Sequence, residues 1–281
     1  MNDIFYFISE TCIANYADDN ALYAVDDTKK GLLKKLTRET ESILDWFRIN
    51  EMRANKDKCH LIVINAHDEC IKLGNVSLTS ESSVELLGVT IDDRLQFKEH
   101  VNRLIKTGNQ KFHALARISK HISENKLKIL MKSFILSQFN YCSLIWMYHD
   151  RTINAKLNKL HERALRMVYK DNISTFEQLL IKDNSMTIHQ RNLQKLGTAM
   201  YKIKNEISPK PIQELFEYHR NRYDLRNEKI WKTRNIRTTL YGAGSMTFQG
   251  PKIWGSIPDE IKASTSTLMF KQKIKKWFPN C

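Results

Sequence analysis

The hydrophobic periodicity of this 281-residue chain changes near residue 93, and no other sequence feature constrains the fold as strongly. Up to residue 92, short apolar stretches alternate with turn-forming residues around one segment of helical spacing, a pattern typical of strands packed on a helix. From residue 93 onward, apolar residues recur every three or four positions almost throughout, as they do in helices. The sequence therefore predicts an α+β unit followed by a mainly helical region.

A β-hairpin is expected first, from two short apolar stretches at residues 12–17 and 21–25. Asp18, Asp19 and Asn20 stand between these stretches and are compatible with a turn. The hairpin should therefore carry its two carboxylates at the tip.

One helix and a small antiparallel sheet are expected to complete the first unit. Asp27 can cap the helix, and Asn50 is a plausible end. The apolar face of this helix needs a sheet to cover. The strands expected to form that sheet are 59–65, 71–73, 76–78 and 84–91.

The helical region should begin with a bundle of three packed helices. A further helix should follow, ended by Pro209 and Pro211, and no regular structure is expected from residue 218 until a last helix. The predicted helices are 97–115, 127–146, 153–169, 187–204 and 268–277.

Charge divides the chain at nearly the same place. The chain has a net charge of +14, but residues 1–92 hold 10 Lys and Arg against 16 Asp and Glu, whereas residues 93–281 hold 35 against 15. A basic region of this size attracts polyanions, nucleic acid first and an acidic membrane surface second. A solvated basic surface with no partner is the alternative that composition leaves open.

Cysteine usage and hydropathy indicate an intracellular protein without a membrane span. The five cysteines are odd in number and scattered, and none forms a CxxC pair, so reduced and mostly buried thiols are expected rather than disulfides or a zinc site. No run of about 18 uncharged apolar residues occurs. The single histidines His161, His189 and His219 lack a partner at ligand spacing, which favours structural or surface roles.

The sequence Tyr-Ala-Asp-Asp at residues 16–19 is the sharpest chemical signal in the chain. Adjacent carboxylates at a hairpin tip direct their oxygens into one small volume, which suits Mg²⁺. Paired Mg²⁺ ions stabilise the attacking and leaving oxygens in nucleotidyl transfer. An ordinary surface turn is the alternative, since Asp is common in turns.

Over nearly its whole length, the chain resembles the reverse transcriptases of non-LTR retrotransposons, close to the Jockey group. The segment at residues 2–4, the tetrapeptide at 16–19 and Asp45-Trp46-Phe47 with Asn50 resemble successive family segments. Residues 55–59 resemble the next motif, and 86–91 resemble the primer-grip hairpin. Phe97 and His100 resemble the start of the thumb. Seven later segments resemble the family's post-polymerase region: residues 140–146, 163–166, 190–193, 223–227, 241–245, 250–254 and 270–271.

The resemblance implies a partial palm at 1–92, a helical thumb at 93–170 and a basic C-terminal region at 171–281. It assigns Asp18 and Asp19 to metal binding and catalysis, and it places a lysine near the incoming nucleotide, which is Lys58 or, as a substitute, Lys56. Template RNA and target or product DNA are the implied partners, with no membrane and no small-molecule substrate. Nuclear and cytoplasmic locations are expected for the family.

The family also uses a third metal-binding aspartate and a fingers region upstream of the hairpin, and neither is found in these 281 residues. Mg²⁺ should therefore bind weakly or not at all, and the positioning on which phosphoryl transfer depends should be absent. A truncated RNA-directed DNA polymerase without activity of its own is the expectation. A non-catalytic nucleic-acid-binding protein and a decayed, non-functional reading frame are the alternatives.

Two basic segments are candidates for nucleic-acid binding. The first, here called the 156–170 basic stripe, steps by three and four along one helix face; its members are Lys156, Lys159, Arg163, Arg166 and Lys170. The second alternates cations with aromatic rings over residues 218–237 and contains Arg220, Arg222 and Arg226, a composition that suits single strands. For both, a solvated basic edge around a small core is the alternative. Pro251, Trp254 and Pro258 are expected to be packing residues.

Overall fold

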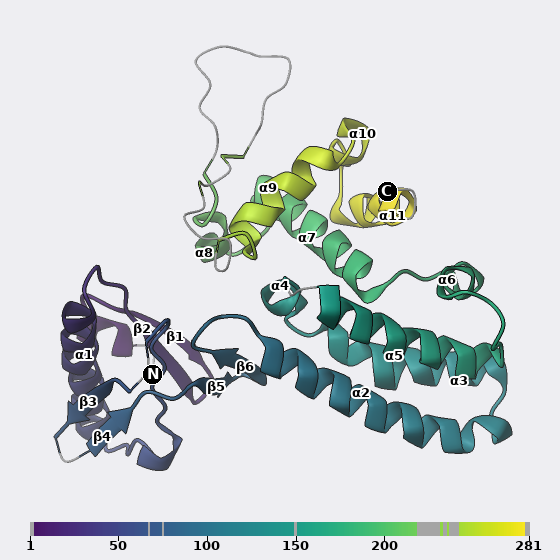
Figure 1. Cartoon of the computed structure of the whole chain (residues 1–281). Coiled ribbons are helices and arrows are strands. Elements are labelled where there is room, and N and C mark those ends of the chain that lie inside the picture. Colours follow the sequence, from purple (N-terminus) through teal and green to yellow (C-terminus); the bar gives the residue numbers. More distant parts are fainter. Residues whose placement is uncertain are drawn as a thin grey trace, which may run out of the picture. The chain divides into compact units, whose positions relative to one another are not determined.

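The computed structural model describes residues 3–66, 68–74, 76–148, 151–217, 231–232, 235 and 242–278. The chain divides into two compact units, residues 1–95 and 96–281. The first contains strands and one long helix, and the second is helical over its described residues (Figure 1). The fold is of the α+β class with small antiparallel sheets, as the sequence predicted.

The hairpin of the first unit is formed by β1 (Cys12–Tyr16) and β2 (Asp19–Tyr23). Tyr16 pairs directly with Asp19, so only Ala17 and Asp18 remain in the turn. The turn is therefore shorter than expected, and Asp19 begins the second strand instead of lying in the loop. Ala17 has a φ of 53°, the positive value that the first residue of a two-residue hairpin turn requires.

The remaining strands form two further hairpins instead of one sheet. These are β3 (Cys70–Leu73) with β4 (Val76–Thr79), and β5 (Ser83–Leu86) with β6 (Val89–Asp92). Leu87 and Gly88, between β5 and β6, both have positive φ, as a type I′ turn demands. The strand expected at 59–65 is wrong, because there only Leu61 forms an isolated bridge, to Ser80.

Helix α1 (Lys29–Ile49) packs against the β1–β2 hairpin and the β3–β4 hairpin. Its N-cap is Thr28 rather than the expected Asp27, and the Thr28 side chain accepts a hydrogen bond from the Gly31 N–H. Buried Trp46 and Ile43 pack with Ile4 and with Ile13 of β1. Leu61, Val63, Ile71 and Leu73 form a second small core beside α1.

The second unit begins with α2 (Lys98–Ile118), and α5 (Arg151–Tyr169) packs against it. Gly108 permits the close approach, since a Cβ there would lie 2.6 Å from Leu160 Cδ2. The helix expected at 127–146 is broken into α3 (Glu124–Leu130), a π-helical segment (Met131–Leu136), a 3₁₀ turn (Ser137–Asn140) and α4 (Ser143–Trp146). Its apolar positions nevertheless enter one core with α2 and α5.

A second core lies around α7 (Ile188–Lys204), which follows α6 (Phe176–Asp183). Short helices α8 (Lys210–Gln213) and α10 (Asp259–Lys262) and the helices α9 (Met246–Ser256) and α11 (Thr267–Trp277) complete the described fold (Figure 1). Helix α9 was not predicted. Trp254 and Pro251 are buried in it, in agreement with their expected packing role, whereas Pro258 is exposed and the expectation is wrong for that residue.

The absence of a membrane-spanning segment and the burial of the cysteines were both expected from composition. None of the helices among the described residues has the length and apolar character needed to cross a bilayer. The expectation of mostly buried thiols is wrong: Cys12 and Cys70 are exposed, Cys59 and Cys142 are only partly covered, and all four are free. Cys281 lies outside the described residues. Cys12 and Cys70 stand on the outer faces of hairpins, where alternation along a strand turns every second side chain to solvent.

Candidate metal centre and nucleic-acid interface

Asp18 and Asp19 are both exposed at the end of the first hairpin. Tyr16, beside Asp19 in the strand register, is 68% exposed. The opposite face of the hairpin carries Ile13 and Leu22, which pack toward α1. One face of the hairpin is therefore anchored, and the other presents the tip, with its two carboxylates, to solvent.

Asn15 and Asn20 form the cross-strand pair next to this tip, on the anchored face. The Asn20 side-chain amide donates to the Asp18 carbonyl oxygen at 3.2 Å, which braces the turn. The Oδ1 atoms of Asn15 and Asn20 are both buried without a hydrogen-bond partner. Such atoms carry a desolvation penalty, so they mark this end of the hairpin as incompletely satisfied.

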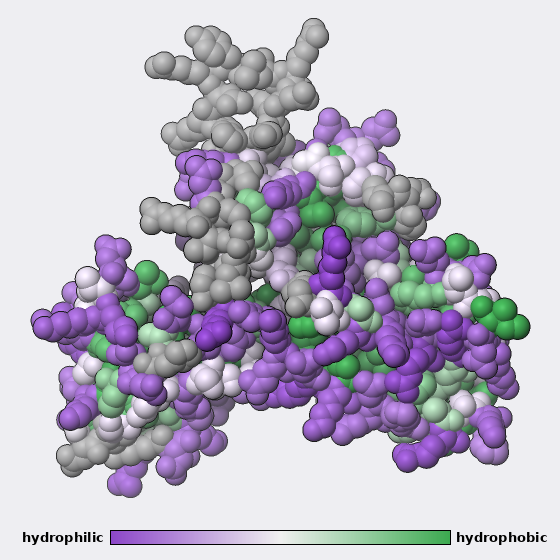
Figure 2. Space-filling view, viewed as in Figure 1, coloured by the Kyte–Doolittle hydropathy of each residue, from purple (hydrophilic) through white to green (hydrophobic). Residues whose placement is uncertain are grey.

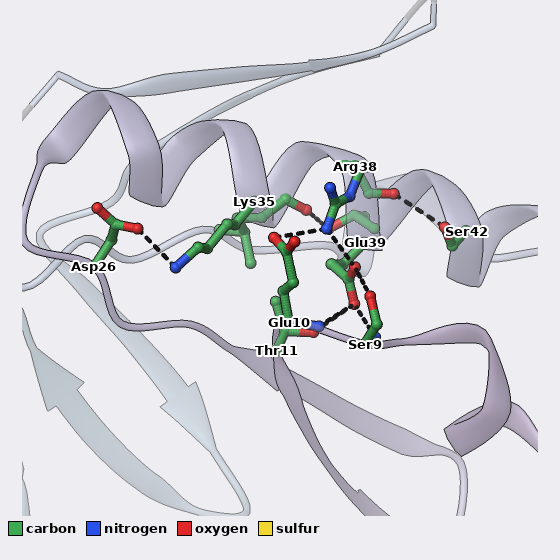
Figure 3. A network of polar contacts seen from close by, with 10 residues as sticks. Ser9, Glu10, Thr11, Asp26, Lys35, Arg38, Glu39 and Ser42 are labelled. Atoms are coloured by element: carbon green, nitrogen blue, oxygen red, sulfur yellow. Dashed lines mark hydrogen bonds and ion pairs between the residues drawn. The ribbon is translucent and has the colours of Figure 1, made fainter.

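Glu39, which the sequence analysis missed, fixes the segment that leads into β1 (Figure 3). Its carboxylate is 2% exposed and accepts hydrogen bonds from the Ser9 N–H at 2.7 Å and the Glu10 N–H at 3.3 Å. The Thr11 hydroxyl and the Arg38 guanidinium contact it at 3.3 and 3.2 Å. Burial pushes the pKa of Glu39 upward, but these hydrogen bonds outweigh burial and lower it below the usual value. The ionised carboxylate thus connects α1 to the start of the hairpin.

Lys58 lies at the end of a short 3₁₀ helix (Lys56–Lys58) and is exposed. Its backbone N–H donates to the Asn55 carbonyl oxygen at 3.1 Å. Among the described residues, no group of three or more His, Cys, Asp or Glu side chains is arranged to hold a metal ion. Asp18 and Asp19 therefore have no third metal ligand beside them among the described residues. The role expected for Lys58 stays a prediction.

The members of the 156–170 basic stripe are of two kinds: three lysines are exposed, and two arginines contact other side chains. Lys156, Lys159 and Lys170 are exposed. Arg163 instead donates to Asn109 Oδ1 at 3.0 Å and lies 4.4 Å from the centre of the Phe112 ring, both on α2. Arg166 binds Glu162 at 2.6 Å. Arg163 thus joins α5 to α2, Arg166 forms an ion pair within α5, and the three lysines face solvent. Hydrophilic residues cover most of the face over α2 and α5 (Figure 2).

Removal of Arg163 tests this division. We expect Arg163→Ala to lower the free energy of unfolding by about 1.5 kcal/mol, because a charged hydrogen bond and a cation–π contact are lost together. Lys159→Ala, on the exposed face of the same helix, should change the free energy of unfolding by less than about 0.5 kcal/mol. Urea unfolding followed by circular dichroism measures both variants. Equal effects of the two substitutions would contradict the structural role of Arg163.

Most of the second basic segment lies outside the described residues, including Arg220, Arg222 and Arg226. Trp231 is described, and it is 3% exposed, packed edge-on against Phe216 in the core around α7. This ring therefore fills a core and is not available for stacking on a base. No local sequence signal distinguishes a Trp that fills a core from a Trp that stacks on a base.

Asp183, at the end of α6, is a second buried carboxylate that the sequence analysis missed. Its side chain is 0% exposed, and its oxygens contact Lys128 Nζ at 2.8 Å, Lys132 Nζ at 3.3 Å and the Tyr169 hydroxyl at 2.8 Å. Burial raises the pKa of Asp183, but hydrogen bonds from Lys128, Tyr169 and Ser185, together with the charge of Lys132, outweigh burial and lower the pKa below its usual value. The carboxylate joins α3, the π-helical segment and α5 to α6.

Of the three histidines singled out in the sequence, His161 is buried and His189 is partly buried. His161 is 0% exposed on α5, and both ring nitrogens lack a hydrogen-bond partner. Burial lowers the pKa of His161 to about 3, with a further contribution from Arg191, so the ring is neutral at ordinary pH. Burial also lowers the pKa of His189. His219 lies outside the described residues.

Comparison with protein-family models, with curated proteins and with solved structures gave no match. The arrangement of the described side chains is therefore the basis for a functional proposal, together with the motif resemblance.

Proposed function

We propose that this chain is the C-terminal part of a non-LTR retrotransposon reverse transcriptase, in which the first unit is a palm remnant. The observation that carries the proposal is the exposed Asp18 and Asp19 pair on a tight hairpin whose other face is anchored on α1. Exposed carboxylates on a rigid support can meet a metal ion and a phosphate without further rearrangement. In this proposal, the helical second unit comprises the thumb and a basic region that contacts template RNA and target or product DNA.

The number of carboxylates at the hairpin tip, Asp18 and Asp19, decides how much Mg²⁺ chemistry we assign to the chain. Two carboxylates suit a single, weakly held and largely hydrated Mg²⁺. They do not suit a two-ion centre, because no third acidic, His or Cys ligand joins Asp18 and Asp19 among the described residues. We therefore expect this 281-residue chain to bind nucleic acid without extending a primer, and we assign no catalytic step to it.

In this proposal, the basic second unit binds the nucleic acid. Residues 96–281 carry 34 Lys and Arg against 14 Asp and Glu, and Lys156, Lys159 and Lys170 are exposed on or just beyond α5. Contacts between such lysines and phosphates release counterions, so affinity falls steeply as salt is raised. A non-catalytic nucleic-acid-binding protein would share this property, and the acidic hairpin is what distinguishes the two proposals.

An RNA template annealed to a DNA primer, titrated across a salt series with and without Mg²⁺, tests the proposal. We expect steeply salt-dependent binding, and we expect Mg²⁺ to raise the affinity only while Asp18 and Asp19 are present. The test variant is Asp18→Asn with Asp19→Asn. The matched control is Asp27→Asn with Glu41→Gln, which removes the same charge from exposed positions in the same unit.

The outcomes separate three interpretations. Loss of the Mg²⁺ increment in the test variant alone supports a palm remnant. Identical binding by all three proteins overturns it in favour of a non-catalytic binding module. Failure of the unaltered chain to bind at low salt leaves a decayed reading frame as the better account.

A further inference from the structure

Helix α11 carries the densest group of exposed cations in the described part of the chain. Lysine occupies positions 271, 273, 275 and 276, all four lysines are exposed, and the helix contains no acidic residue. Phe270 and Ile274 of the same helix are buried in the core around α7. The helix is thus held by its apolar side, and its other side is almost purely cationic.

The lysines cover the outward side of α11. At about 100° per residue, the buried positions 270, 274 and 278 fall within about 80° of one another. Lys271, Lys275 and Lys276 fall within an adjoining arc of about 140°, and Lys273 lies beyond it. Lys271 and Lys275 stand one turn apart, about 6 Å along the axis. This is a row of charges and not an isolated cation.

Neighbouring lysines of the same core are engaged in other contacts. Lys252 lies 3.9 Å from the centre of the Phe248 ring, and Lys204 and Lys262 lie over the ring of Trp254. Lys273 donates to the Glu260 carbonyl oxygen at 3.2 Å. For Lys271, Lys275 and Lys276, no acidic partner lies within 4 Å among the described residues. Favourable interaction with the helix dipole accounts for lysines in the last turn, but not for Lys271.

We propose, on the basis of the proposed function, that the lysine face of α11 binds the phosphate backbone of nucleic acid. Lysines act as point charges and offer no planar, bidentate group for reading a base. The contact should therefore be independent of sequence and should position the nucleic acid. A bilayer surface fits less well, because membrane-bound helices bury a continuous apolar face in the lipid. The apolar face of α11 is already covered, and only Leu268 and Met269 in its first turn are exposed.

Neutralisation of all four lysines to glutamine in the full chain tests this inference. We expect the affinity for single-stranded RNA and duplex DNA to fall by at least about tenfold at about 0.1 M salt. The slope of log affinity against log salt should decrease by about 2 to 3, because Lys271, Lys275 and Lys276 are available for phosphates and each lost phosphate contact removes about 0.7 to 0.9 from the slope. The four-fold lysine-to-arginine variant should retain both values.

A matched control removes four exposed cations from the first unit by substitution with glutamine, at Lys30, Lys34, Arg53 and Lys72. If the control lowers the affinity as much as the α11 variant does, net charge and not the lysine face determines binding, and the inference fails. If the chain binds nucleic acid but the α11 variant binds equally well, the inference fails while the proposed function stands. If the unaltered chain does not bind at all, both fail. If the unaltered chain binds anionic vesicles, and the α11 variant loses this binding but still binds RNA equally well, the lysine face would be assigned to a membrane surface instead.

Discussion

Asp183→Asn should lower the free energy of unfolding of the second unit by about 3 kcal/mol. The Asp183 carboxylate is completely buried and faces Lys128, Lys132 and Tyr169. Removal of one member of a buried ion pair leaves the others without their partner and costs about 3 to 5 kcal/mol. The lower end applies here, because the Lys128 and Lys132 side chains are 30% and 44% exposed and can regain water. Chemical unfolding followed by circular dichroism at 222 nm reports mainly on this helical unit.

The control for this variant is Asp259→Asn. Asp259 also pairs with a lysine, Lys262, at 3.1 Å, but the Asp259 side chain is 97% exposed. Exposed pairs contribute little, so the change should stay below about 0.5 kcal/mol. Equal losses in the two variants would show that burial does not set the contribution of Asp183.

The pH dependence of the Asp183 effect has a definite sign. Because the folded-state pKa of Asp183 is lowered, the carboxylate stabilises the fold above its unfolded pKa of about 3.9. That contribution is lost as the pH falls through the folded value. The difference between the unaltered chain and Asp183→Asn should therefore be constant from about pH 5 to pH 8 and should shrink below about pH 4.

The helical half of the fold could be predicted from the sequence because helical periodicity reports which face is buried. The expected helices at 97–115, 153–169 and 187–204 correspond closely to α2, α5 and α7. Periodicity does not report the hydrogen-bonding pattern, however. Buried Leu127, Met131 and Ile135 share one face across α3 and the π-helical segment, so a single helix was expected where the backbone changes its pattern.

The candidate sites were predictable only where they are local in sequence. Asp18 and Asp19 are adjacent, and the apolar stretches beside them indicate a hairpin. Asp183 meets Lys128 from 55 positions away, and Glu39 meets Ser9 from 30 positions away. No spacing rule connects such residues, because the folded backbone alone brings them together. Arg163 is a further example. Its place in the 156–170 basic stripe suggested a phosphate contact, but in the fold its side chain donates to Asn109, which lies 54 positions away on α2.

Glu39→Ala should destabilise the first unit by about 2 to 3 kcal/mol and loosen the entry to the acidic hairpin. The substitution leaves the partly buried N–H groups of Ser9 and Glu10 without an acceptor. An unsatisfied buried donor costs about 1 to 3 kcal/mol, and the lower end applies where water can reach the donor. Because residues 9–11 lead directly into β1, amide exchange should accelerate at Ser9, Glu10 and along Cys12–Tyr16.

Glu41→Ala is the matched control for Glu39→Ala, since it removes the same side chain from an exposed position of the same helix. It should change the stability by less than about 0.5 kcal/mol and leave exchange in β1 unaltered. Glu39→Gln keeps the size but replaces one acceptor oxygen by a donor, so it should recover only part of the loss. Complete recovery by glutamine would mean that shape, and not the ionised carboxylate, holds the segment before the hairpin. Unchanged exchange in β1 with Glu39→Ala would separate Glu39 from the positioning of Asp18 and Asp19 altogether.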